Sequence, residues 1–161
     1  MKVDKAVGFI EKGAILKTKV KLIDPPEEMI PLKWQVKHKL KLLEINGVNI
    51  ALTGLADLAS KDIRDLKKLL KTIKLQLNSK DIIHNSQKIQ KGKKSNQKKI
   101  IEIKATRGHS RLLAFFSEKN EIIICTHTYW KTSSNKKQQN REFDKAANLY
   151  QQYLKHYKKN K

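Results

Sequence analysis

Basic, imidazole and phenol side chains gather near predicted strand ends in the C-terminal part of the chain. Six of them are Arg107, His109, Arg111, His127, Tyr129 and Lys131. Metal-free RNA cleavage needs a base for the 2′-hydroxyl proton, cations to offset phosphorane charge, and an acid for the leaving 5′-oxygen. Lys, Arg, His and Tyr supply these functions, and aromatic rings also stack on bases. The cluster therefore suits a phosphodiester substrate.

Other kinds of catalytic or ligand site leave no pattern in the sequence. There is no phosphate-binding G-x-x-x-x-G-K loop, no paired-cysteine zinc pattern and no H-E-x-x-H motif. A metal-dependent nuclease needs several acidic ligands, whereas Glu102 and Glu121 are expected at the surface. The lone thiol of Cys125 lies in an apolar run and is expected to be a buried packing residue. We therefore expect neither a metal nor a cofactor.

The charge of the chain indicates a polyanionic partner. The 161 residues carry 36 Lys+Arg and 15 Asp+Glu, a net charge of +21. Residues 1–77 contribute +7 and residues 78–161 contribute +14, so the C-terminal half is the expected anion-binding half. Nucleic acid, an acidic protein or an anionic membrane surface would all fit, and a general lysine bias for solubility is the alternative. With no apolar run of about 18 residues and no signal-peptide pattern, we expect a cytoplasmic protein without a membrane partner.

Apolar spacing in the first third of the chain predicts a helix followed by two strands. Residues 3–10 have helical spacing, whereas 16–22 and 36–42 alternate lysines with apolar residues, as half-buried strands do. The two strands could pair around the proline break at 24–26, although a helix across the second stretch is the alternative. The Asn-Gly pair at 46–47 predicts a turn.

A long helical region and a basic loop are expected next. Residues 55–77 have helical spacing, and the polar and acidic positions within 60–65 predict that two helices meet there. Residues 78–98 are polar and lysine-rich, which predicts a mobile loop. Lys93 and Lys94 on this loop are candidate contacts for an RNA backbone.

The rest of the chain predicts three strands and a closing helix. Strands are expected over 99–104, 112–116 and 121–127, with the apolar run in the last of them typical of a central strand. Phe, Ala, Leu and Tyr residues over 143–157 outline the helix, and its tyrosines have the spacing of core residues.

Strand alternation divides the candidate side chains between the two faces of the sheet. Glu102 and Lys104 are two residues apart and share a face. His127 and Tyr129 share a face if the last strand continues that far, and Trp130 then points the opposite way, into packing.

The order of these segments resembles the RelE/HigB toxin superfamily, most closely its HigB-like, phage-derived branch. The similar segments are K-I-I-E-I-K at 99–104, G-H-S-R-L-L-A-F-F at 108–116, and 122–131 leading into a Lys-Thr step and a helix. The match covers about sixty C-terminal residues and extends more weakly to about residue 34. Members are small mRNA endonucleases of toxin–antitoxin pairs that usually cut mRNA on the ribosome.

The resemblance implies a role for each matching residue. Arg111 would bind phosphate, His127 or Lys104 would be the base, Tyr129 would orient or stack, and Lys131 would stabilise charge or assist the leaving group. Further phosphate contacts are expected from Arg107 and His109.

We therefore predict an α+β fold, with a small, mainly antiparallel β-sheet packed with helices as in RelE. Residues 1–33 would form an N-terminal extension and residues 34–161 the toxin domain. The expected function is metal-independent mRNA cleavage that inhibits translation, with mRNA, the ribosome and a cognate antitoxin as partners and the oligomeric state open. The alternatives are a non-catalytic basic nucleic-acid-binding protein and a gyrase-directed toxin of the same fold.

Overall fold

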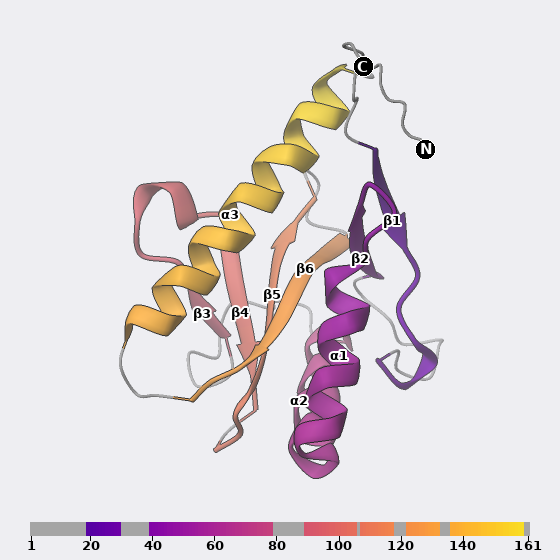
Figure 1. Ribbon diagram of the computed structural model, residues 1–161, viewed down its shortest axis with the longest axis vertical. Helices are drawn as coiled ribbons and strands as arrows, with labels where there is room; N and C mark the ends of the chain where they lie inside the picture. The colour runs from indigo at the N-terminus through magenta and orange to yellow at the C-terminus, as the bar shows by residue number, and fades with distance from the viewer. Residues whose placement is uncertain are drawn as a thin grey trace, which may run out of the picture.

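The computed structural model describes residues 19–29, 39–78, 89–105, 107–117, 122–132 and 136–159, and these form one mixed sheet with helices on both faces (Figure 1). The elements in chain order are β1 (Val20–Ile23), the 3-10 helix η1 (Glu27–Met29), β2 (Lys39–Ile45), α1 (Ile50–Lys61), α2 (Ile63–Asn78), β3 (Ile89–Lys91), the 3-10 helix η4 (Ser95–Gln97), β4 (Ile100–Lys104), β5 (Ser110–Phe116), β6 (Ile122–Trp130) and α3 (Lys136–Lys159).

The sheet confirms the predicted α+β class. Its strand order is β1-β2-β6-β5-β4-β3, and every neighbouring pair is antiparallel except β2 and β6, which are parallel. The parallel pair is possible because α1, α2 and three strands separate β2 from β6 in the chain. Strand β6 lies inside the sheet, as its apolar run predicted.

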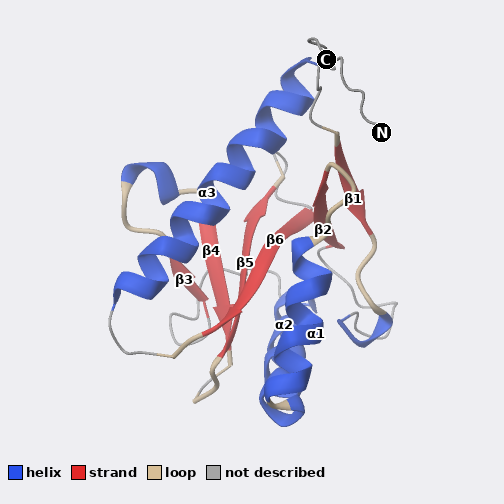
Figure 2. Cartoon of the chain, viewed as in Figure 1, coloured by secondary structure: helices blue, strands red, loops and turns tan. Residues whose placement is uncertain are grey.

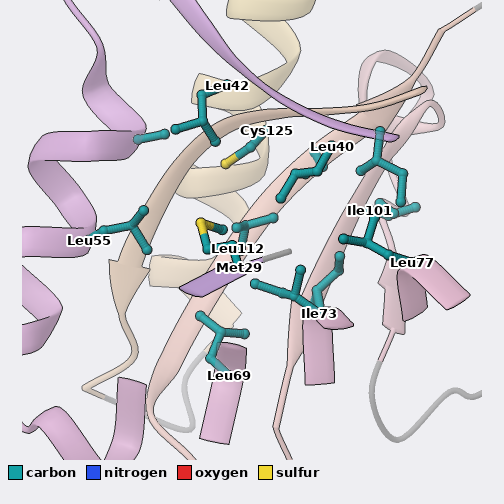
Figure 3. Packing of buried hydrophobic residues seen from close by; sticks show 14 of the residues in the cluster. Met29, Leu40, Leu42, Leu55, Leu69, Ile73, Leu77, Ile101, Leu112 and Cys125 are labelled. Atoms are coloured by element: carbon teal, nitrogen blue, oxygen red, sulfur yellow. The ribbon is translucent and has the colours of Figure 1, made fainter. Parts of the chain in front are cut away.

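Helices α1 and α2 pack on one face of the sheet, and α3 crosses the other (Figure 2). Figure 3 shows the core beneath α1 and α2, where Leu55, Leu69 and Ile73 meet apolar side chains of the sheet such as Leu42 and Leu112. Cys125 lies in this core and is fully buried, as predicted. Burial raises the pKa of its thiol, which is consistent with a packing role.

Aromatic side chains dominate the contact between α3 and the sheet. The ring of Phe115 on β5 lies 4.7 Å from that of Tyr150 and 4.9 Å from that of Tyr153, measured between centroids. Both tilted pairs have the geometry that aromatic rings prefer. Tyr157 packs against the same core, so the predicted packing role of the helix tyrosines is confirmed.

Several predicted elements of the N-terminal half are also confirmed. Strands β1 and β2 pair antiparallel, with Val20 opposite Ile45, so the described part of the second stretch, from residue 39, is a strand and not the alternative helix. Residues 46 and 47 form the predicted turn, with φ of 51° and 80°, a conformation that Asn and Gly adopt most readily. Helices α1 and α2 meet at Asp62, whose carboxylate accepts hydrogen bonds from the N–H groups of Arg64 and Asp65.

Part of the expected N-terminal extension belongs to the same sheet and core. Strand β1 is the edge strand of the sheet, and Met29 is fully buried beneath α1 and α2. The predicted helix over 3–10 and the start of the predicted strand over 16–22 lie outside the described residues.

One predicted loop and one predicted helix start differ from the structure. The prediction of a mobile loop over 78–98 is wrong for its second half, which forms β3 and η4. Strand β3 pairs with β4, and Gln97 is buried where its side chain donates to the Asp144 carboxylate at 2.7 Å. The composition of this segment is polar and therefore predicted a loop. The apolar residues that β3 pairs with, Ile101 and Ile103, are on β4 and give no signal within the segment itself. Helix α3 likewise begins at Lys136, several residues earlier than expected.

Candidate active site

Three of the predicted site residues form one row across neighbouring strands. The Cα atom of Lys104 on β4 pairs with that of Arg111 on β5, which pairs with that of Tyr129 on β6. Directly paired residues point to the same face of a sheet, so these side chains lie next to one another on the face covered by α3. The next row on that face contains Glu102, Leu113 and His127.

A β-bulge decides the direction of His127. The register between β5 and β6 pairs Leu113 with His127 but Ala114 with Cys125, which leaves Thr126 as an extra residue. In a regular strand without the bulge, His127 would share the face of Cys125, two residues earlier, and point under α1 and α2. The bulge turns His127 to the α3 face instead. Tyr129, two residues further along the strand, shares that face as predicted, and Trp130 packs on the opposite side, also as predicted.

Glu102 is the centre of a buried polar cluster, and its predicted position at the surface is wrong. Its carboxylate is fully buried and accepts hydrogen bonds from the Tyr129 hydroxyl at 2.5 Å and from Gln139 Nε2 at 3.0 Å. Arg111 Nε lies 3.7 Å from the same carboxylate. Helix α3 covers this face of β4, which strand alternation alone does not reveal. Burial, with a further contribution from Glu102, raises the pKa of Tyr129 far above its usual value.

His127 is buried, and both of its ring nitrogens have protein partners. Nδ1 lies 3.1 Å from Thr126 Oγ1, and Nε2 lies 2.9 Å from a carboxylate oxygen of Glu142 on α3. The hydrogen bond with His127 lowers the pKa of Glu142, and burial only partly opposes it. In this arrangement His127 ties the sheet to α3, with neither nitrogen turned toward open solvent.

Two backbone carbonyl groups hold the guanidinium of Arg111. Its Nη1 donates to the Gly108 carbonyl at 2.6 Å and to the Ser110 carbonyl at 3.1 Å. Its Nε is buried and makes no hydrogen bond among the described residues. The guanidinium is therefore held in one orientation, with some of its donor capacity unused.

Lys104 and Lys131 form a more accessible cationic rim beside this cluster. Both side chains are half-buried. Burial lowers the pKa of Lys104, Glu102 raises it, and the charges of Arg111 and Lys131 lower it again. Arg111 and Lys131 are thus close enough to Lys104 to influence its protonation. The three cations form a local positive field at this end of the sheet.

Arg107 and His109 are exposed on the turn between β4 and β5. The His109 ring stacks on Trp130 at 4.7 Å, and its Nδ1 lies 2.9 Å from the Lys131 carbonyl oxygen. Asp65 on α2 holds this turn from the other side by accepting backbone hydrogen bonds from His109 and Ser110, both at 2.8 Å. Burial opposes ionisation of Asp65, but these N–H donors prevail and lower its pKa.

Helix α3 provides the partners of the segment that contains Lys93 and Lys94. Lys93 is exposed beside Lys136, and the hydrogen bond with Lys136, followed by the positive charge of Lys136, lowers the pKa of Lys93. Lys94 precedes η4, whose residue Asn96 donates to the Asp144 carboxylate at 3.2 Å. These lysines lie between β3 and η4, beside the N-terminal part of α3, whereas Lys104, Arg111 and Lys131 form a separate group.

Sequence reasoning missed the residues of α3 that complete the cluster. Gln139 donates to Glu102 and exchanges hydrogen bonds with Gln90 of β3, and Glu142 holds His127. Gln138 donates to the carbonyl of Trp130 at 3.0 Å. Gln139 and Glu142 are three residues apart on a helix, so they share a face, but only the position of α3 shows that this face meets β4 and β6.

Two further properties of the described residues bear on the site. Within the described part of the chain, no three His, Cys, Asp or Glu side chains group closely enough to hold a metal ion. None of the described helices has the length and apolar character needed to cross a membrane.

Comparison with known proteins yields no match to a family model, to a curated protein or to a solved structure. The interpretation of the site therefore depends on its own geometry. That geometry offers three neighbouring cations, a buried carboxylate 3.7 Å from one of them, and a tyrosine and a histidine held by internal hydrogen bonds.

Proposed function

We propose that this protein is a metal-independent endoribonuclease, the toxin of a toxin–antitoxin pair that cuts mRNA and inhibits translation. The observation that supports this most is the row of Lys104, Arg111 and Tyr129 across adjacent strands, with Lys131 within range of their charges. Cations fixed together can offset the charge that develops on a phosphorane. The ribosome as the place of cleavage and an antitoxin as the inhibitor follow from the resemblance to RelE/HigB proteins.

Within this proposal, Lys104 is the better candidate for the base. Its lowered pKa makes the neutral amine easier to reach, and its side chain is half-buried at the accessible rim. His127 is fully engaged with Thr126 and Glu142 and serves to position the strand. Arg111 and Lys131 stabilise charge on the phosphate, while Glu102 orients Arg111 and Tyr129.

The first test is cleavage of RNA by the purified protein in the presence of EDTA. Lys104→Ala and Arg111→Ala should each lower the cleavage rate by about 100-fold or more, because each removes a group that acts in the transition state. Lys68→Ala and Arg64→Ala are matched controls on the exposed surface of α2 and should leave the rate unchanged. Circular dichroism should show that all four variants are folded.

The pH dependence of the same reaction tests the role of Lys104. If neutral Lys104 is the base, the cleavage rate should rise with pH as the amine loses its proton. Because the pKa of Lys104 is lowered, the rate should level off below pH 10.5, the ordinary pKa of a lysine. Cleavage that survives both Ala substitutions, or that stops when EDTA is added, would contradict the proposal.

A second candidate function is non-catalytic nucleic-acid binding by the same face. It is favoured by the internal hydrogen bonds of His127 and Tyr129, which occupy the groups that would otherwise handle protons. Exposed Arg107 and His109 would then contact the phosphate backbone beside the rim lysines. In this case RNA would remain intact, and its affinity would fall steeply with salt concentration.

A further inference from the structure

An apolar groove runs along the face of the molecule that lies opposite α3. It has a volume of about 650 Å³ and lies between η1, α1 and α2. Met29, Leu55 and Leu66 are buried residues of its wall, and Leu52 and Ile63 are apolar residues that remain exposed at 38% and 48%. Exposed apolar side chains that line one concave surface mark a place where another molecule binds.

One edge of this groove carries a line of positive charge. Lys67, Lys71 and Lys74 on α2 line it at spacings of four and three residues. At a rise of about 1.5 Å per residue, the line extends for about 10 Å along the helix. Among the described residues that line the groove, none is acidic.

We propose that this groove binds an amphipathic helix of a partner protein. The apolar face of that helix would fill the groove, and Glu or Asp residues three or four apart along its flank would face the lysines of α2. An amphipathic helix in an apolar groove is a recurrent mode of recognition, with anchors at such intervals. The inference depends on the groove alone and holds whatever reaction the α3 face performs.

The distribution of charge favours this occupant over three others. A second copy of the chain would bring the same lysines together across a symmetric contact, which like-charge repulsion opposes. A fatty acid has a single carboxylate, whereas the lysines extend over about two turns of α2. Nucleic acid would need stacking surfaces, and the described lining residues include no aromatic side chain.

A synthetic peptide provides a direct test with the full-length protein. The probe is an 18-residue fluorescein-labelled helix with Leu at positions three and four apart and Glu along one flank. Fluorescence anisotropy should show saturable binding that weakens as salt is added, because surface ion pairs are screened. A peptide with Lys in place of every Glu should not bind. Equal binding of the two peptides would overturn the charge assignment.

Charge reversal of the groove lysines tests where the peptide binds. The triple variant Lys67→Glu, Lys71→Glu, Lys74→Glu should lose affinity by about tenfold or more, because each attraction becomes a repulsion. The matched control reverses Lys61, Arg64 and Lys68, which are exposed on the same two helices and do not line the groove. The control should change affinity by less than about threefold. Equal losses in both variants would overturn the assignment to the groove.

The apolar half of the proposal has its own variant. Ile63→Ser exchanges an exposed residue of the groove and should leave the protein folded while weakening the peptide several-fold. RNA cleavage by this variant should equal that of the parent, so failure of the groove proposal and failure of the nuclease proposal are distinguishable. A parent protein that sediments as a dimer, and that Ile63→Ser converts to a monomer, would overturn the helical partner in favour of a second copy.

Discussion

The two faces of the sheet bury carboxylates in different ways. Beneath α3, Glu102 is fully buried among side chains, with Tyr129, Gln139 and Arg111 as partners. Beneath α2, Asp65 accepts backbone N–H groups of His109 and Ser110 and thereby anchors a turn. Apolar residues of α2 also pack on the sheet, and Leu69 and Ile73 are fully buried there.

Apolar contacts and buried polar clusters contribute differently to a fold. Apolar contacts beneath α1 and α2 contribute in proportion to the area that they remove from water. A buried polar cluster adds little net stability, because desolvation offsets its attractions, but it holds its members in one geometry. Apolar packing stabilises the fold on both faces, since Phe115 and its neighbours form a second apolar core beneath α3. We infer that the α3 face in addition holds polar groups that would otherwise be unfavourable in a core.

The largest expected effect is from loss of the central carboxylate on the α3 face. Glu102→Ala leaves the Arg111 charge buried without compensation and should lower the free energy of unfolding by about 3–5 kcal/mol in urea denaturation. Asp57→Ala, an exposed residue of α1, is the control and should change it by less than about 0.5 kcal/mol.

A double substitution sharpens this comparison. Adding Arg111→Leu to Glu102→Ala removes the unpaired charge and should recover part of the lost stability. If the two substitutions instead destabilise additively, Glu102 and Arg111 act independently and the contrast between the faces fails.

An intermediate effect is expected where α1 meets β6 on the apolar face. A Cβ atom added at Gly54 would lie 2.1 Å from Thr128 Oγ1, so Gly54→Ala requires a shift in a packed contact. The substitution should destabilise by about 1–2 kcal/mol in thermal or urea unfolding, despite the better helix propensity of Ala. In a Thr128→Ala background the obstacle is gone, and the same change should stabilise by about 0.5–1 kcal/mol. Destabilisation in both backgrounds would show that close packing of α1 on β6 is not the cause.

The smallest effect is expected at the link between β6 and α3. The hydrogen bond with His127 lowers the pKa of Glu142 in the folded protein, so ionised Glu142 stabilises the fold. This contribution is fully present above pH 4.5, the ordinary pKa of a glutamate, and is lost as the pH falls through the lower pKa of the folded state. Glu142→Gln should therefore flatten the dependence of unfolding free energy on pH below about 5. Asp57→Asn is the control and should leave the profile unchanged. Identical profiles for Glu142→Gln and the parent would remove the His127 contact as a source of acid sensitivity.

The sequence predicted features that depend on residues close together in the chain. Alternation identified the strands, and the shared face of His127 and Tyr129 is confirmed. The bulge at Thr126, which decides that this face is the one under α3, left no signal in the sequence. Prediction failed for Glu102, since one acidic residue in an alternating strand normally faces solvent. It also failed for β3, whose three residues become a strand only by pairing with β4.

The sequence by itself determined the α+β class, the order of the main elements and the concentration of cations near the ends of β4, β5 and β6, because these follow from local spacing and composition. Only the tertiary structure decided which groups are buried together. Tyr129 meets Glu102 across 27 positions of sequence, and Asp65 meets His109 across 44. Such contacts depend on strand register, on one bulge and on where α3 docks, and these are set by packing between distant parts of the chain.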